Sequence, residues 1–366
     1  MASILTIPCH WDKKIIKEII SYNSKGRGIR IGEIYGTLAK SPLRHGRASN
    51  TVPEINKTEA IGFKRFADSV GLKFNYLINA PLPTKYKSGL DRESIDYLKW
   101  VLFKFKPDYV TVSSLEIIKE IRKIDKNIKI NISTIANIKS PKNLKKFIPF
   151  KISRVVPHHD VGKSIKKIKA LTKFCEKLGI TLELLATESC LYKCPRREAH
   201  YRYLANANYD KPFHTDCNLV KITNPAEFLM AGGTIRPEDI KFYESLGLNY
   251  FKITGRSKPT KWLPIVAKAY LERKYNGNLI RLLGADPSLK IEQWIYIDNK
   301  SLNGFLQNFP FDESDSEKRL YCNRIINKLY ATKGFHIKDK SKYQFINNSL
   351  VLMTPGKIVK HKLLNR

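Results

Sequence analysis

The chain has 366 residues and 42% hydrophobic content, which is enough for one large domain with an appendage. The chain has 66 lysines and arginines and 33 acidic residues, which gives a net charge of +33. This charge favours anionic partners such as RNA or an acidic protein. A composition rich in Lys, Ile and Asn is, however, also typical of an AT-rich genome. No apolar run is long enough to span a bilayer, the N-terminus has no signal peptide and six cysteines are too few for a disulfide scaffold, so we expect a cytoplasmic protein without membrane insertion.

Short apolar runs alternate with amphipathic segments along the chain. The runs predicted as strands are 4–8, 29–35, 74–79, 109–113, 128–133, 154–157, 181–186 and 250–254. A helix is predicted over 164–178, where Ile168, Leu171 and Cys175 share an apolar stripe and Gly179 supplies the stop. Eight strands separated by helices predict an α/β fold, a (β/α)8 TIM-like barrel, with a doubly wound open sheet as the competing arrangement.

The barrel is expected to occupy residues 1–276, and a basic C-terminal α/β extension is expected over residues 277–366. Within this extension, residues 294–297 are predicted as a strand and residues from about 316 to 332 as a helix.

Polar residues fall at the carboxyl ends of the predicted strands, where barrel enzymes carry their active sites. We take Glu188, Lys252 and Arg256 as candidate catalytic residues. Glu188 would act as an acid or base, whereas two cations in an otherwise apolar eighth segment indicate an anionic substrate. For Arg256, a structural ion pair with a neighbouring acid explains the sequence equally well. Further polar residues at strand ends are Cys9, His10, Glu33, Tyr35, Asn75, Asn79, His158, His159 and Asp160. We interpret the histidines of the last group as part of a hydrogen-bonded loop.

Three cysteines gather where the seventh strand ends. Cys190 and Cys194 form a C-x3-C pair, and Cys217 follows. Dithiol redox pairs use C-x2-C, and tetrahedral zinc usually recruits two close pairs. The spacing therefore favours an iron–sulfur cluster over zinc. A zinc ion in this place would use His200 or His214 as an additional ligand.

A fourth cluster ligand is not evident from the spacing. Cys322 shares a helical stripe with apolar residues, and Cys9 lies at the mouth of the predicted barrel. Either would complete the cluster, and otherwise one iron keeps an open position. Cys175 is interpreted as a core residue.

Four segments resemble the U-32 family of collagenase-like peptidases. The cysteine segment and the last segment are the specific ones, and the likeness covers most of residues 1–285. The segments are Phe74 to Ala80, Glu188 to Pro195, Ile235 to Asp239 and Phe251 to Arg256.

This resemblance implies a barrel that holds a 4Fe-4S cluster on four cysteines. Such relatives carry out oxygen-independent hydroxylation of ubiquinone precursors or RNA bases, with prephenate as the oxygen source, and the ubiquinone members act in pairs. Carried over by position, Cys190, Cys194 and Cys217 match the cluster ligands, and Cys322 is the expected fourth.

The function that we favour from this resemblance is a modifying enzyme that acts on an RNA, a peptide or a small molecule. Two alternatives are a partner subunit in a heterodimer with a second family member, and a peptidase. The sequence offers no recognisable nucleophile–base pair or hydrolytic zinc motif for the last of these.

Overall fold

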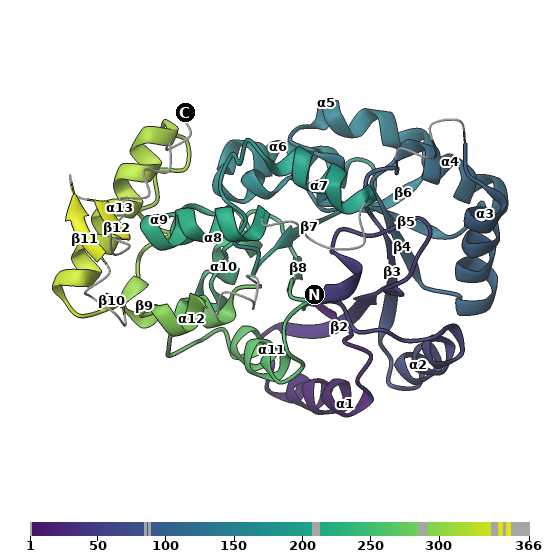
Figure 1. Cartoon of the computed structure of the whole chain (residues 1–366), viewed down its shortest axis with the longest axis horizontal. Coiled ribbons are helices and arrows are strands. Elements are labelled where there is room, and N and C mark those ends of the chain that lie inside the picture. Colours follow the sequence, from purple (N-terminus) through teal and green to yellow (C-terminus); the bar gives the residue numbers. More distant parts are fainter. Residues whose placement is uncertain are drawn as a thin grey trace.

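The computed structural model describes residues 2–83, 86, 89–206, 213–284, 291–337, 343–346 and 349–352. Eight parallel strands form its centre (Figure 1). They are β1 Ser3–Pro8, β2 Ile29–Gly36, β3 Lys73–Ile78, β4 Tyr109–Val112, β5 Lys129–Ile132, β6 Ile152–Val155, β7 Thr181–Leu185 and β8 Tyr250–Lys252. All eight predicted strands are confirmed, with ends that shift by one or two residues.

The sheet closes on itself. Leu5 of β1 lies opposite Ile31 of β2 on one side and opposite Phe251 of β8 on the other. Each remaining strand pairs in parallel with its neighbours in chain order. This arrangement confirms the predicted (β/α)8 barrel and excludes the open doubly wound sheet, which has two edge strands.

Helices surround the barrel and continue into the C-terminal part (Figure 1). Those associated with the barrel are α1 Lys13–Ser21, α2 Lys57–Ser69, α3 Arg92–Lys99, α4 Leu115–Ile124, α5 Pro141–Leu144, α6 Ile165–Glu176, α7 Arg197–Asn206, α8 Phe213–Thr223, α9 Ala226–Met230, α10 Ile240–Glu244 and α11 Trp262–Glu272. Of the described helices, none is both long enough and apolar enough to cross a bilayer.

Helix α6 forms as the sequence pattern predicts. The Ser164 hydroxyl caps its first turn by accepting from the backbone N–H of Lys167. Leu171 and Cys175 face the core and are almost fully buried, so Cys175 is a core residue as expected. Gly179 adopts a φ of 63° beyond the helix end, a conformation that glycine adopts without strain.

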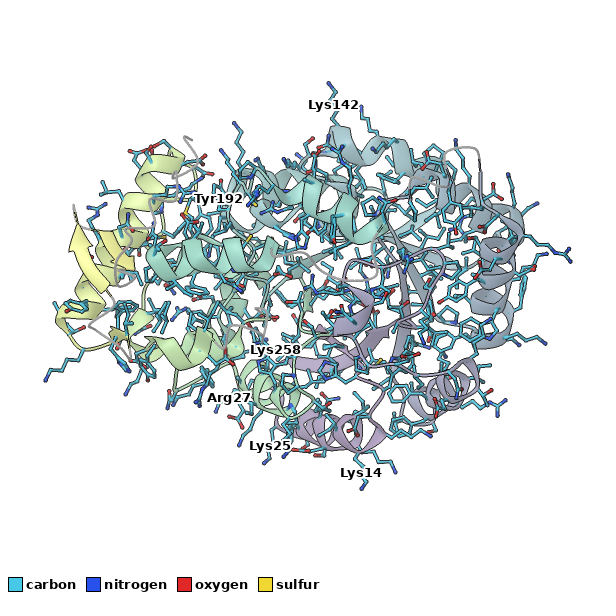
Figure 2. All side chains as sticks on the ribbon, viewed as in Figure 1. Lys14, Lys25, Arg27, Lys142, Tyr192 and Lys258 are labelled. Atoms are coloured by element: carbon cyan, nitrogen blue, oxygen red, sulfur yellow. The ribbon has the colours of Figure 1, made fainter. Side chains whose placement is uncertain are left out.

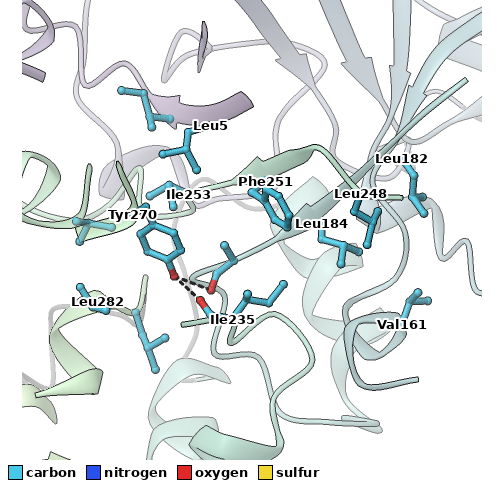
Figure 3. Packing of buried hydrophobic residues seen from close by; sticks show 14 of the residues in the cluster. Leu5, Val161, Leu182, Leu184, Ile235, Leu248, Phe251, Ile253, Tyr270 and Leu282 are labelled. Carbon is cyan, nitrogen blue, oxygen red and sulfur yellow. Dashed lines mark hydrogen bonds between the residues drawn. The ribbon is translucent and has the colours of Figure 1, made fainter. Parts of the chain in front are cut away.

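The core between the barrel and its last helices is apolar, except for the hydrogen-bonded hydroxyl of Tyr270 (Figure 3). Tyr270 of α11 is buried among Leu5, Ile253 and neighbouring residues. Its hydroxyl donates to the carbonyl of Ile235 at 2.5 Å and approaches that of Ala186 at 3.2 Å. The helix is thereby fixed to the end of β7, directly before the cysteine segment.

A buried ionic group fills the lower half of the barrel. Arg154 of β6 donates to both carboxylate oxygens of Glu33 at 2.8 and 2.9 Å and lies 3.5 Å from Glu183. Its guanidinium is stacked between the rings of Tyr109 and Tyr250, at 4.9 and 4.5 Å from their centroids. We had placed Glu33 among the residues at the barrel mouth, and this is wrong, because Glu33 points into the barrel and binds Arg154.

The C-terminal part lies beside the β7–β8 side of the barrel (Figure 1). Its elements are α12 Ile291–Trp294, β9 Ile295–Ile297, α13 Asp315–Ala331, β10 Phe335–Ile337, β11 Tyr343–Ile346 and β12 Ser349–Leu352. The predicted strand and the predicted long helix are confirmed as β9 and α13. Strand β9 pairs with β10, and β11 pairs with β12, both antiparallel. The division at residue 276 stays a prediction.

Charged side chains cover the periphery of the molecule. Figure 2 shows Lys14, Lys25 and Lys142 extending outward from different sides of the barrel. Because these lysines are spread around the surface, the high net charge by itself indicates no single docking face.

Candidate functional site

The cysteine segment leaves β7 along a short backbone ladder. The N–H of Ile235 donates to Ala186, and the N–H of Glu188 donates to Gly233, both at 2.9 Å. A side chain on Gly233 would meet the Glu188 carbonyl at 2.7 Å, so only glycine permits this approach. The ladder places Glu188 at the barrel mouth and Cys190 just beyond it.

Cys190, Cys194 and Cys217 are electrostatic neighbours at the end of this ladder. Cys217 of α8 is hydrogen-bonded to Cys194, and Cys190 is an electrostatic neighbour of both. The contact with Cys194 and burial raise the pKa of the Cys217 thiol, and burial raises that of Cys190. Three thiols this close would repel one another as thiolates unless positive charge lies nearby.

Two buried cations supply that charge. Arg197 of α7 is an electrostatic neighbour of Cys190, and it also contacts Asp160 at 3.3 Å. Lys221 of α8 is 4% exposed, and its ammonium contacts only neutral oxygens, those of Ser189 and Asn218 at 3.3 Å. Both cations lower the pKa of Cys190 against the effect of its burial. The effect of burial is nevertheless larger, so the pKa of Cys190 remains raised, as does that of Cys217, and both thiols are held in the neutral form.

The other predicted ligands do not join this group. Cys322 of α13 is fully buried and has Lys163 and Arg319 as its charged neighbours. Cys9 packs against Gly36 beside Arg256. The side chain of His214 lies outside the described residues. Within the described part of the chain, no three His, Cys, Asp or Glu side chains are already placed around a metal position.

A cavity of about 60 Å³ opens at the carboxyl ends of the barrel strands. All three candidate catalytic residues line it, which places them at the expected end of the barrel. Its charged and hydrogen-bonding walls include Tyr35, Arg47, His159, Glu188, Tyr201, Lys252 and Arg256.

Arg256 has no acidic partner in this cavity. Its side chain is 9% exposed, its Nη1 atom has no hydrogen-bond partner among the described residues, and the charged residue that acts on it most strongly is another cation, Arg47. Burial and that like charge lower the pKa of Arg256 to about 10. The alternative explanation of Arg256 as half of a structural ion pair is therefore wrong. An uncompensated buried guanidinium is the arrangement expected of an anion site.

Lys252 and Glu188 are held by other contacts. The Lys252 ammonium lies 4.0 Å from the centroid of the Tyr35 ring, and burial lowers its pKa against the pull of Glu183 and Glu33 below it. Glu188 pairs with Arg47 at 3.1 Å. Arg47 comes from the long connection between β2 and α2, so this ion pair ties that connection across the cavity to the cysteine segment.

Sequence reasoning missed several members of the cavity wall, among them Tyr201 and Thr134. The hydroxyl of Tyr201 on α7 lies 2.7 Å from Nε2 of His159, and Nδ1 of His159 lies 3.0 Å from the hydroxyl of Thr134. His159 does belong to a hydrogen-bonded loop, as interpreted, but it also lines the cavity. The signal available in the sequence was the proximity of Tyr201 to the Cys190–Cys194 pair.

The cysteine segment is also held from outside the barrel. Asp315 at the start of α13 accepts from the hydroxyl of Tyr192 at 3.2 Å and from the ammonium of Lys193. Arg319, one turn later, contacts Glu227 of α9. Tyr192, labelled in Figure 2, thus lies between the barrel and the C-terminal helix.

Comparison with known proteins supports the sequence resemblance. The model of Peptidase family U32 matches residues 91–278. An uncharacterized protease of Methanocaldococcus jannaschii is 27% identical over 277 residues, which are 73% of this chain and 80% of that protein. Among solved structures, the U32 peptidase Mk0906 is similar with a TM-score of 0.46 and 12% identity, over 69% of this chain and 92% of that one.

Proposed function

The chain belongs to peptidase family U32, and we propose that within this family it is an iron–sulfur-dependent modifying enzyme. The proposed reaction is an oxygen-independent hydroxylation that uses a prephenate-type donor. The acceptor would be an RNA, a peptide or a small molecule. The main observation that supports this proposal is the group of three thiols near Arg197 and Lys221, beside the anion cavity.

Thiolates are the ligands that a 4Fe-4S cluster takes, and Cys190, Cys194 and Cys217 would be three of them. Their side chains would have to turn toward one position, because in the described part of the chain they are not arranged around a metal site. Cys322, whose charged neighbours are Lys163 and Arg319, is not among the electrostatic neighbours of these thiols. A cluster with three such ligands supplies an iron with an open position, at a potential set by burial and nearby charge. Arg197 and Lys221 would compensate part of its negative charge.

The residues of the cavity have separate tasks in this proposal. Arg256 binds a carboxylate through its unpartnered Nη1, and Lys252 adds positive charge below it. Glu188 is oriented by Arg47 and is placed to take or return a proton between the cavity and the cysteine segment. Below the cavity, the barrel interior holds the buried ionic group of Arg154, Glu33 and Glu183.

Iron and sulfide analysis of anaerobically purified protein tests the proposal. We expect iron and sulfide in the wild-type protein and their loss in the Cys190→Ala, Cys194→Ala and Cys217→Ala variants. Cys175→Ala is the control and is expected to retain iron, because Cys175 packs in the core. Cys322→Ala and Cys9→Ala are also expected to retain it. Wild-type protein without iron and sulfide would contradict the proposal.

Peptide hydrolysis is the second candidate, favoured by one contact. Thr134 and His159 form a hydroxyl–imidazole pair at the cavity, at 3.0 Å. However, the Thr134 hydroxyl also lies 2.8 Å from the carbonyl of Pro157, which can only accept, so its proton points away from the histidine. This geometry leaves Thr134 without an activating base, and we rank hydrolysis below modification.

The predicted macromolecular partners stay proposals. For RNA, the affinity should fall steeply as salt rises, because phosphate contacts release counterions. A second family member would be detected as a heterodimer after co-expression.

A further inference from the structure

We propose that a groove outside the barrel mouth, beside the cysteine segment, binds the phosphodiester backbone of a single-stranded nucleic acid, with Lys139 and Lys167 as phosphate contacts. The inference rests on the proposed function in one respect, because it selects a nucleic acid among the three classes of acceptor. Binding in the groove requires neither the iron–sulfur cluster nor the anion site at Arg256, so the two proposals can be tested separately.

The groove has a volume of about 500 Å³ and adjoins the barrel cavity. Its walls come from the segments after β5 and β6, the first turn of α6, the cysteine segment and the start of α7. Thr134, Ile135 and Tyr201 line both spaces, so the groove and the cavity meet at these side chains. A ligand chain that lies in the groove therefore passes beside the barrel mouth and beside Cys194, which is part of the same wall.

Basic side chains outnumber acidic ones in the groove wall. The basic residues are Lys139, Lys167, Lys193, Arg197 and Arg202, and the acidic residues are Asp160 and Glu198. Both acids are used within the wall. Asp160 pairs with Arg197 at 3.3 Å, and Glu198 pairs with Arg202 at 3.2 Å. Lys193 is paired with Asp315 of α13. The two remaining lysines thus give the groove its excess of positive charge.

Lys139 and Lys167 come from different elements and act on the same part of the groove. Both side chains are exposed, and within the described part of the chain neither ammonium forms an ion pair. Burial and the charges of Arg197, Lys139 and Lys167 lower the pKa of His158, another wall residue, to about 3. The two lysines therefore converge on a neutral ring, and the positive charge around it lacks a negative partner.

The start of α7 adds further positive potential to the groove. This helix has ten residues, and its first residues line the groove. The N-terminal end of a helix carries partial positive charge and favours phosphate groups. Arg197 in the first turn is 5% exposed, and its terminal nitrogens bind His158 and the carbonyl of Leu191. Its Nε atom has no hydrogen-bond partner among the described residues, and a phosphate oxygen would supply the acceptor.

A nucleic acid matches this groove better than an acidic peptide does. A phosphodiester backbone carries one charge per nucleotide whatever its sequence, and its binding to lysines releases condensed counterions, which adds to the affinity. The net charge of +33 also attracts a long polyanion beyond the groove itself. A single strand is expected because the proposed modification of a base at the barrel mouth requires an unpaired base.

Fluorescence anisotropy with a labelled oligouridylate of about twelve nucleotides tests the inference on the full-length chain. The double variant Lys139→Gln/Lys167→Gln should bind the oligouridylate roughly tenfold more weakly than wild-type protein, which is the effect of losing two exposed ion pairs. The slope of log affinity against log salt should become less steep by about 1.4, because each phosphate contact on a single strand contributes about 0.7.

The matched control is Lys142→Gln/Lys169→Gln, which removes the same charge from α5 and α6 at exposed positions outside the groove wall. Lys142 extends outward from the barrel (Figure 2). The control should bind the oligouridylate like wild-type protein. The inference is overturned if the two double variants bind alike, if wild-type protein does not bind the oligouridylate, or if oligoglutamate or an RNA duplex of equal length binds as tightly.

The iron analysis gives a separate result. Protein without iron whose affinity for the oligouridylate falls only in the groove variant would contradict the proposed enzyme and support the groove. Protein that contains iron, but whose groove variant binds like the control, would retain the proposed enzyme and overturn the groove as the binding site.

Discussion

The two ends of the barrel interior treat buried charge in opposite ways. In the lower half, Arg154 is clamped by Glu33, approached by Glu183 and covered by two aromatic rings. At the mouth, Arg256 is also buried, but among the described residues it forms no ion pair with a carboxylate, and a second arginine lies near it. The comparison teaches that burial of a charged residue does not identify a site, whereas burial without compensation does.

The largest effect is expected from breaking the lower group. Arg154→Met would leave two carboxylates buried without their cation, and we expect it to lower the free energy of unfolding by about 3–5 kcal/mol. Urea denaturation measures this. Arg92→Met, at a fully exposed position on α3, is the control and should change stability little. A neutral result for Arg154→Met would remove the distinction between the two ends.

At the barrel mouth, replacing the buried arginine is expected to change the free energy of unfolding in the opposite direction. Arg256→Met removes a guanidinium that has no partner, so we expect it to raise the free energy of unfolding of the ligand-free protein by about 1–3 kcal/mol. The same denaturation measurement applies. Strong destabilisation would mean that Arg256 has a structural role and would argue against an anion site.

Low pH is expected to reduce the stability of the protein by a smaller amount, through a buried histidine at the barrel mouth. His45 is fully buried near Arg44, Arg47 and Arg256, and burial and these charges lower its pKa well below 6.5. Since the unfolded chain binds a proton there and the folded chain does not, stability is lost as pH falls below about 6.5. Between pH 7.5 and pH 5.5, His45 contributes a loss of at most about 1.4 kcal/mol.

Comparing unfolding at these two pH values in His45→Gln and wild-type protein measures the contribution. The variant should lose less stability at the lower pH. His336→Gln is the control, because His336 is exposed on β10 and should leave the pH dependence as it is. An identical pH dependence in His45→Gln and wild-type protein would contradict the lowered pKa, because it would show that folding leaves the pKa of His45 unchanged.

Sequence reasoning predicted the elements of the fold and favoured a closed barrel over an open sheet, which the structure confirms. The strands were evident because each is a short apolar run between turn signals. Barrel closure depends on Leu5 meeting Phe251, a pairing across most of the chain that no local pattern encodes. The direction of a buried side chain is equally non-local, which is why Glu33 was assigned to the mouth although it binds Arg154.

The site was predictable to a similar extent. The end of β7 and the segment after β8 were identified from polar residues at strand ends, and both line or border the cavity. Tyr201 was missed because a tyrosine on a polar helix gives no sign of the direction it faces. Cys322 is fully buried with Lys163 and Arg319 as its charged neighbours, and its assignment as the fourth ligand stays a prediction.

Asp315 contacts both Tyr192 and Lys193, and it follows Lys193 by 122 residues in the sequence. The contact therefore couples two distant parts of the chain. A barrel cut from this protein before α13 would lose the anchor of its cysteine segment while keeping all eight strands. Any transplant, chimera or shortened version that is meant to preserve the thiol geometry must therefore carry the start of that helix along.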